Sequence, residues 1–257
     1  MSPVRPQSPF GVELRHWRER RGVSQLRLAS SAAMSPRYVS FVETGRARPS
    51  RAVVERLADA LDVPLRERNR LLVAAGFAPA YPEVALDADA LATFRHVVES
   101  LLEKQEPYPA LVLDGAYRLV LANGAARRLL PELDTMDWID AAFAPTSPLR
   151  AAVENFAEVA WHAADTLRRE SNPPQDCLLR LERHLEGIAR PAAADLTTEH
   201  VLCPRFRFGD RVVRTFTAIA RFGTARNVTL DELRVELFFP ADEDSARFFR
   251  ELAGAEK

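Results

Sequence analysis

The stretch 22–50, GVSQLRLASSAAMSPRYVSFVETGRARPS, contains two short helix patterns separated by a tight corner. Ser24 stands before the first pattern, where a serine can accept a hydrogen bond from the free N–H groups of a helix start. Ser35 and Pro36 begin the second pattern, because proline at the first helical position loses no hydrogen bond. Gly45 favours the left-handed conformation that ends many helices. We therefore predict two helices joined by a short turn.

The second of these helices is predicted to have two unlike faces. Val39 and Val42 lie three residues apart and form an apolar stripe that faces the core. Arg37, Ser40 and Phe41 point the other way. Two short helices at this offset are typical of a helix-turn-helix, in which the second helix enters the major groove of DNA.

The stretch resembles the helix-turn-helix of the XRE/Cro/C1 repressor family, and the match runs over about residues 10–75. The motifs that carry it are S-Q-x-x-L-A, S-x-x-Y-[IV]-S and E-x-G-x-x-x-P-S, which begin at Ser24, Ser35 and Glu43. One departure is Ala33, because the family usually has glycine at the turn. A left-handed conformation at an alanine is slightly strained.

The resemblance implies roles for several side chains. It places Gln25 against a DNA phosphate, and it places Arg18 and Glu43 in an internal ion pair between the first and third helices. Phe41 lies off the apolar stripe, so it is either a core residue or a contact for a thymine methyl group. The residues expected to bind DNA are Gln25, Ser35, Pro36, Arg37, Ser40, Phe41, Thr44, Arg46 and Arg48.

Charge supports DNA binding over the alternative, a helical pair that never contacts DNA or that binds protein instead. Residues 1–80 contain fourteen arginines and seven acidic residues, a net charge of +7, and the remaining residues carry −8. A basic module followed by an acidic one is typical of a DNA-binding domain with a regulatory domain attached.

Length and composition agree with two domains. The chain has 257 residues, of which 47% are hydrophobic, enough for a core in each domain. No run of eighteen apolar residues occurs and the first residues lack a signal-peptide core, so we expect a cytoplasmic protein. Cys177 and Cys203 are too few and too far apart for a disulfide framework or a zinc site. We expect no metal and no cofactor.

Helix signals divide the chain. Residues 1–76 are predicted to form a five-helix, lambda-repressor-like domain. Residues 77–88 contain two prolines and no clear period, so we read them as a linker. Residues 89–257 are predicted to form the second domain.

The second domain is predicted to mix helices with an antiparallel sheet. After a helix over about 91–104, two apolar strands flank Asp114-Gly115, a strong hairpin signal. A helix capped by Asn123 follows, and the apolar spacing over 137–187 is helical. From 201 the pattern alternates as in strands, and a final helix is expected over about 242–252. Two strands, helices and then three strands is the order of a PAS-like domain, of the α+β class with a helical cover.

Two segments of this domain carry a second resemblance. Residues 107–130, PYPALVLDGAYRLVLANGAARRLL, look like the opening of the MmyB-like ligand-binding domain, which often follows an XRE helix-turn-helix in bacterial regulators. Residues 222–242, FGTARNVTLDELRVELFFPAD, resemble its end. The resemblance covers most of residues 88–257, and its motifs are structural rather than chemical. It implies a pocket for a small apolar, fatty-acid-like molecule.

Aromatic residues are the candidates for the walls of that pocket, although each could simply fill the core. His162 could bind a carboxylate head group, and so could Arg205, Arg207 or Arg214. The expected ligand-binding residues are Trp138, Phe156, Trp161, His162, Phe206, Phe216 and Phe238.

Catalytic motifs are missing from the sequence. The histidines lack H-x-x-x-H or H-E-x-x-H spacing, and there is neither a G-x-S-x-G nor a phosphate-binding glycine loop. We therefore expect no catalytic residues and no enzyme activity. A haem sensor would need one axial histidine, which His162 or His184 could supply, but lone histidines are common.

Together these features predict a sequence-specific DNA-binding regulator whose C-terminal domain senses a small apolar molecule. We expect a homodimer that places two recognition helices roughly 34 Å apart on a palindromic operator. The alternative is a helix-turn-helix protein whose C-terminal domain binds no ligand and serves for dimerisation or partner recruitment. A filled core would favour that alternative, and a cavity would favour the sensor.

Overall fold

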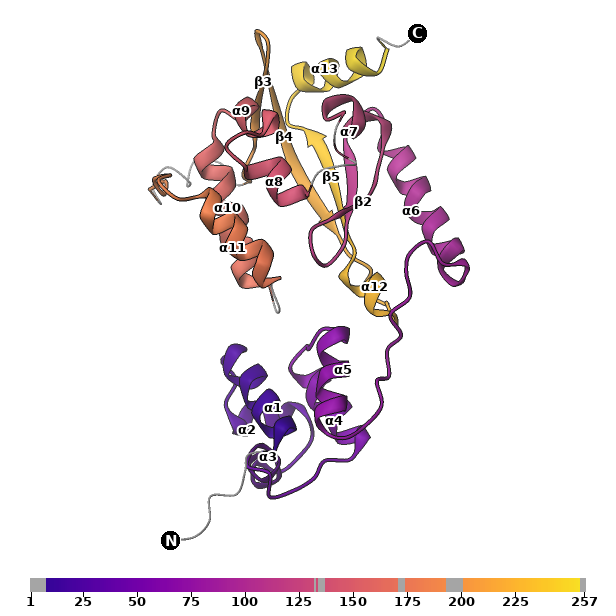
Figure 1. Cartoon of the computed structure of the whole chain (residues 1–257), viewed down its shortest axis with the longest axis vertical. Helices are drawn as coiled ribbons and strands as arrows, with labels where there is room; N and C mark the ends of the chain where they lie inside the picture. Colours follow the sequence, from indigo (N-terminus) through magenta and orange to yellow (C-terminus); the bar gives the residue numbers. More distant parts are fainter. Residues whose placement is uncertain (1–7, 132, 134–136, 171–173, 193–200, 255–257) are drawn as a thin grey trace. The chain divides into compact units, whose positions relative to one another are not determined.

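The computed structural model describes residues 8–131, 133, 137–170, 174–192 and 201–254. The chain divides into two compact units, drawn in Figure 1. The helical unit extends to Glu83 and also contains Thr224–Asp231, and the sheet unit contains Val84–Gly223 and the chain from Glu232 onward. Among the described residues, no helix has the length and apolar character needed to cross a bilayer.

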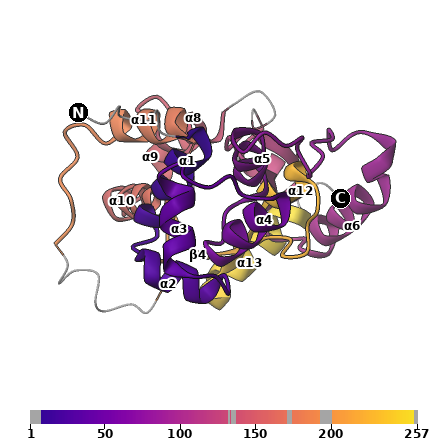
Figure 2. The ribbon, with the colours of Figure 1, turned by 90° about the horizontal axis from the view of Figure 1, so that it is seen from below.

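The helical unit contains the five predicted helices, which confirms that part of the sequence analysis. Their bounds are α1 Pro9–Arg20, α2 Gln25–Ser31, α3 Pro36–Glu43, α4 Arg51–Ala60 and α5 Leu65–Ala74. Helix α3 packs against both α1 and α2, and Figure 2 shows these three helices together. Their core is fully buried at Leu14, Leu28, Val39 and Leu57.

Capping side chains set the helix starts as predicted. The Ser24 side chain accepts a hydrogen bond from the Arg27 N–H, and the Ser35 side chain accepts one from the Tyr38 N–H, each at 3.2 Å. The expectation that Ser50 also caps a helix is wrong, because its side chain makes no cap hydrogen bond at the start of α4. Ala33 has a φ of 52°, so the turn between α2 and α3 is left-handed at an alanine, as the departure from the family pattern implied.

Gly11 allows α1 to approach the end of α3. A Cβ atom at this position would lie 2.4 Å from the carbonyl oxygen of Glu43 and 2.8 Å from that of Val42. Both are backbone atoms, which cannot move aside without shifting the helix.

Gly11→Ala is therefore expected to lower the free energy of unfolding of the helical unit by about 1–3 kcal/mol. Hydrogen–deuterium exchange in urea, followed on peptides from α1 to α5, measures this change. Val12→Ala, at an exposed position on the same helix, is the control and should change stability by less than about 0.5 kcal/mol. Equal stability of the two variants would contradict the prediction, because it would show that α1 and the end of α3 can move apart at no cost.

The sheet unit is built on five antiparallel strands in the order β2-β1-β5-β4-β3. Their bounds are β1 Ala110–Leu113, β2 Leu119–Ala122, β3 Arg205–Phe208, β4 Arg211–Ala220 and β5 Arg234–Pro240. The predicted hairpin is confirmed, because β1 pairs with β2 and the Asp114 carboxylate accepts hydrogen bonds from the N–H groups of Ala116 and Arg118 at the turn.

Helices lie on both sides of this sheet. Figures 1 and 2 show α8–α11 on one side and α6 on the other. The bounds are η1 Asp89–Leu91, α6 Ala92–Lys104, α7 Gly124–Leu129, α8 Trp138–Phe143, α9 Pro148–Ala152, α10 Phe156–Arg169, α11 Gln175–His184 and α13 Glu243–Gly254. As predicted, the Asn123 side chain caps α7, accepting a hydrogen bond from the Ala126 N–H. A short helix that was not predicted, α12 Val228–Glu232, lies between β4 and β5.

Strand register decides which side chains face α8–α11. On β4 and β5, Thr217 pairs with Phe238 and Ile219 pairs with Glu236. Since side chains alternate along a strand, Thr217, Glu236 and Phe238 lie on one face of the sheet, and Phe216 lies on the other.

Candidate DNA-binding surface and ligand cavities

The start of α3 and the loop after it form an exposed basic surface. Ser35, Pro36 and Arg37 are exposed at the beginning of α3. Beyond its end, Thr44, Arg46 and Arg48 are exposed as well, so both ends of this helix present predicted DNA-binding residues to solvent.

Phe41 is held between two arginines of this surface. The Arg37 guanidinium lies 5.1 Å from the centroid of the Phe41 ring, and that of Arg46 lies 5.9 Å from it. Such cation–π contacts orient the guanidinium groups of exposed arginines. Ser40 is half-buried beside Phe41 on α3, and its carbonyl accepts a 2.7 Å hydrogen bond from the Thr44 hydroxyl.

The expected ion pair between α1 and α3 is present and includes a third side chain. Arg18 donates to both Glu43 carboxylate oxygens, from Nε at 2.6 Å and from Nη2 at 3.1 Å. Arg18 also donates to the Val23 carbonyl at 3.0 Å. The Gln25 amide, which the resemblance placed against phosphate, donates to Glu43 at 2.8 Å. Gln25 is thus held in place at the N-terminus of α2.

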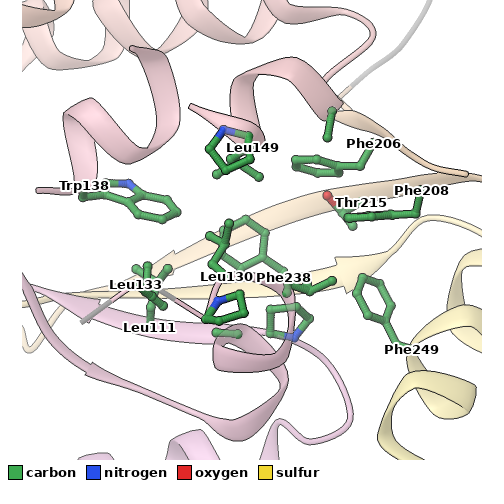
Figure 3. Close-up of a pocket in the computed structure, with 16 residues that line it drawn as sticks. Leu111, Leu130, Leu133, Trp138, Leu149, Phe206, Phe208, Thr215, Phe238 and Phe249 are labelled. Atoms are coloured by element: carbon green, nitrogen blue, oxygen red, sulfur yellow. The ribbon is translucent and has the colours of Figure 1, made fainter. Parts of the chain in front are cut away.

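Two adjoining cavities lie between the sheet and its helical cover. Their volumes are about 500 and 460 Å³, within the range of ligand pockets. The first is lined mostly by apolar side chains, which come from α7, α9 and strands β1, β3, β4 and β5. Figure 3 shows Leu111, Leu149, Phe206 and Phe249 around it. Side chains common to both cavities are Trp138, Leu149, Phe206 and Phe238.

The structure brings five of the seven predicted ligand-binding residues to these cavities. Trp138, Phe206 and Phe238 line both, and Phe156 and His162 line the second. Trp161 and Phe216 line neither cavity. The alternative head-group residues Arg205, Arg207 and Arg214 line neither of them either.

The two outlying aromatics have other contacts. The Trp161 indole N–H donates to the Ile188 carbonyl at 3.2 Å, which turns this ring toward the segment after α11. Phe216 alternates with Thr215 and Thr217, so it lies on the far face of the sheet and stacks on Phe239 with ring centroids 5.4 Å apart. Both faces of the sheet carry aromatic residues, and the spacing of these residues in the sequence does not tell which face helices α8–α11 cover.

The second cavity contains charged groups that the sequence analysis passed over. Arg234 and Glu236 both line it. Arg234 is paired with Glu170 and lies over the Tyr117 ring, with its guanidinium carbon 4.4 Å from the ring centroid. Burial raises the pKa of Glu236 to about 7, although the nearby Arg234 lowers it. Burial lowers the pKa of His162, on α10.

A signal for Glu236 exists in the sequence. In the strand 234–240, RVELFFP, Glu236 stands two residues before Phe238, a predicted ligand contact, so the two side chains are expected on the same face of the strand. A charged residue in phase with a pocket-facing aromatic indicates that the pocket is not wholly apolar. Among the described residues no three histidine, cysteine or acidic side chains are grouped so that they could hold a metal ion.

Two family models match the chain. Residues 9–71 match a helix-turn-helix domain, and residues 94–252 match the MmyB-like transcription regulator ligand binding domain. The first match contains α1–α3 with their basic surface, and the second contains the sheet and both cavities.

Individual proteins show partial similarity. The uncharacterized HTH-type transcriptional regulator RghRB of Bacillus subtilis (strain 168) is 32% identical over 117 residues, which cover 45% of this chain and 76% of RghRB. The restriction-modification controller protein C.AhdI from Aeromonas hydrophila is 38% identical over 24% of this chain and 92% of its own, with a TM-score of 0.23. An RNA-binding light-oxygen-voltage receptor is 13% identical, covers 97% of this chain and 64% of its own, and has a TM-score of 0.24.

Proposed function

Because this chain belongs to the family of transcription regulators that carry an MmyB-like ligand-binding domain behind a helix-turn-helix domain, we propose that it controls transcription in response to a small apolar molecule. The family is one of regulators and not of enzymes. In this proposal the protein acts in the cytoplasm, α3 reads a specific DNA sequence, and the sheet unit binds the molecule.

The DNA-binding part rests on the surface around α3. Its exposed arginines suit contacts with phosphates and with guanine edges, and the cation–π pairs with Phe41 hold two of them in place. A homodimer with two such helices roughly 34 Å apart would bind a palindromic operator.

The sensing part rests on one observation, the pair of cavities beneath the helical cover. A C-terminal domain that served only for dimerisation would be expected to have a filled core. Cavities of about 500 and 460 Å³ with largely apolar walls suit a fatty-acid-like chain instead. The order of elements, two strands, helices and then three strands, supports a PAS-like fold for this unit.

Chain connectivity offers a route from ligand to DNA. Strands β4 and β5 carry Thr217, Glu236 and Phe238 on the cavity face, and the chain between these strands enters the helical unit as Thr224–Asp231. There the Asp231 carboxylate accepts a hydrogen bond from the Leu65 N–H at the start of α5, at 3.1 Å. A ligand that favours one arrangement of β4 and β5 could thereby bias the helical unit.

Arg37→Ala is expected to weaken binding to the specific operator by about 1–3 kcal/mol while weakening nonspecific binding much less. The reason is that Arg37 stands exposed at the start of the recognition helix. Fluorescence anisotropy at two salt concentrations measures the specific affinity on DNA from upstream of the gene and the nonspecific affinity on a scrambled duplex. Arg247→Ala, at an exposed arginine on α13, is the control. Equal losses on both duplexes would assign Arg37 to phosphate contact only.

Native mass spectrometry of the intact protein tests the sensing part. We expect a dimer that carries a small apolar molecule from the cell, and removal of that molecule should change operator affinity. A protein that is purified empty, and whose operator affinity is the same before and after solvent extraction, would favour the dimerisation or recruitment module.

A further inference from the structure

Glu236 is a buried carboxyl group that lines the second cavity. This residue of β5 is 9% exposed, and it lines the cavity among Phe143, Trp138 and Phe238. No donor within hydrogen-bonding distance of it is found in the described part of the chain. Burying an unpaired carboxylate is unfavourable, so a ligand that donates a hydrogen bond to Glu236 would be stabilised here.

The nearby cation does not fill that need. Arg234 stands two residues before Glu236 and lies on the same face of β5. Its guanidinium, however, is paired with Glu170 and lies over the Tyr117 ring. His162 on α10 also lines this cavity, and burial lowers its pKa and so disfavours its charged form. Since Arg234 is already paired with Glu170, Glu236 is the charged group of this lining to which a head group can donate a hydrogen bond.

The apolar part of a ligand has an obvious place. The two cavities share the side chains of Trp138, Leu149, Phe206 and Phe238, so they adjoin. Thr215, which lines the first cavity, pairs with Pro240, and Ile219 pairs with Glu236. These positions lie four residues apart along the strands, or about 13 Å. A molecule with its head at Glu236 can lay an alkyl chain along β4 and β5 into the first cavity.

We propose that this site takes an elongated apolar molecule whose head group donates a hydrogen bond to Glu236, such as an alkyl alcohol, amide or amine, and that it discriminates against a carboxylate head. The proposal rests on the sensing function given above and names its ligand class. A second carboxylate beside Glu236 would meet a like charge in a site of low dielectric constant, whereas a donor would satisfy the buried oxygens.

Three probes that differ only in the head group test the proposal on the full-length protein, namely decanol, decylamine and decanoate. Isothermal titration calorimetry at pH 8.5 is expected to show decanol or decylamine bound about tenfold or more tightly than decanoate, the factor that one hydrogen bond to a charged group provides. Decanoate should bind better at pH 6, where Glu236 is protonated. Arg234, Tyr117 and His162 face the same cavity and are present for every probe.

Variants separate Glu236 from the rest of the cavity. Glu236→Gln should reduce the preference between decanol and decanoate to within about threefold of equality, and Glu186→Gln, at an exposed carboxylate, should leave it unchanged. Decanoate bound at pH 8.5 as tightly as decanol by the wild-type protein would overturn the head-group assignment but leave the sensing function standing. Failure of every decyl probe to bind would overturn both.

Discussion

Replacing Glu43 by alanine is expected to lower the free energy of unfolding of the helical unit by about 3–5 kcal/mol. The Glu43 side chain is 3% exposed and that of Arg18 is 12% exposed, so the pair is removed from water. Without Glu43, the Arg18 guanidinium keeps its bond to the Val23 carbonyl and a 3.7 Å ion pair with the exposed Glu19, and the Gln25 amide loses its acceptor. Loss of the buried carboxylate that pairs most closely with Arg18 accounts for most of the expected effect.

Hydrogen–deuterium exchange in urea on peptides from α1 to α5 measures this effect within the helical unit. Glu55→Ala removes the partner of Arg51 in a pair that is exposed on α4, and it should leave exchange nearly unchanged. Glu43→Ala should also weaken operator binding, because Gln25 and α3 lose their common anchor. A loss of less than about 1 kcal/mol would show that Arg18 finds water or another partner when Glu43 is absent.

Replacing Glu236 by glutamine is expected to remove a pH dependence of roughly 2–3 kcal/mol from the stability of the sheet unit between pH 5 and pH 8. Burial raises the pKa of Glu236 in the folded protein to about 7, against 4.5 for the ordinary group. The folded state therefore holds the proton more tightly than the unfolded state does. The stabilisation is full below about pH 4.5 and is lost as the pH rises through 7.

The comparison of variants isolates this group from its neighbours. Burial lowers the pKa of His162, which makes the fold less stable as the pH falls, but His162 is present in the wild-type protein and in both variants. Urea unfolding of the ligand-free proteins at pH 5 and pH 8 should give a smaller difference for Glu236→Gln than for the wild type. Glu186→Gln should keep the wild-type difference. Equal differences in all three proteins would mean that water or local movement solvates Glu236.

Local signals predicted much of the fold. Ser24 and Ser35 set the starts of α2 and α3, and the Asp114-Gly115 turn set the β1–β2 hairpin, because each depends on neighbours within a few residues. The family resemblance predicted the Arg18–Glu43 pair. It did not indicate that Gln25 would be held by the same carboxylate.

Long-range contacts account for what the sequence did not reveal. Phe216 and Phe238 were both assigned to the pocket, but the phase of β4 against its helical cover places them on opposite faces of the sheet. Glu236 is not among the predicted ligand-binding residues, and its place in the cavity depends on packing against helices far away in the sequence. The inclusion of Thr224–Asp231 in the helical unit depends on contacts with Leu65 and Pro82, far away in the sequence.

That segment limits how the protein can be taken apart. A fragment that ends at Glu83 lacks Asp231, so the N–H of Leu65 loses the carboxylate that accepts its hydrogen bond, and Pro82 loses the N–H of Val228. A truncation after Glu83 therefore does not give the complete helical unit. A chimaera that joins this helix-turn-helix to another sensor would need to graft Thr224–Asp231 as well, or supply a new acceptor at the start of α5.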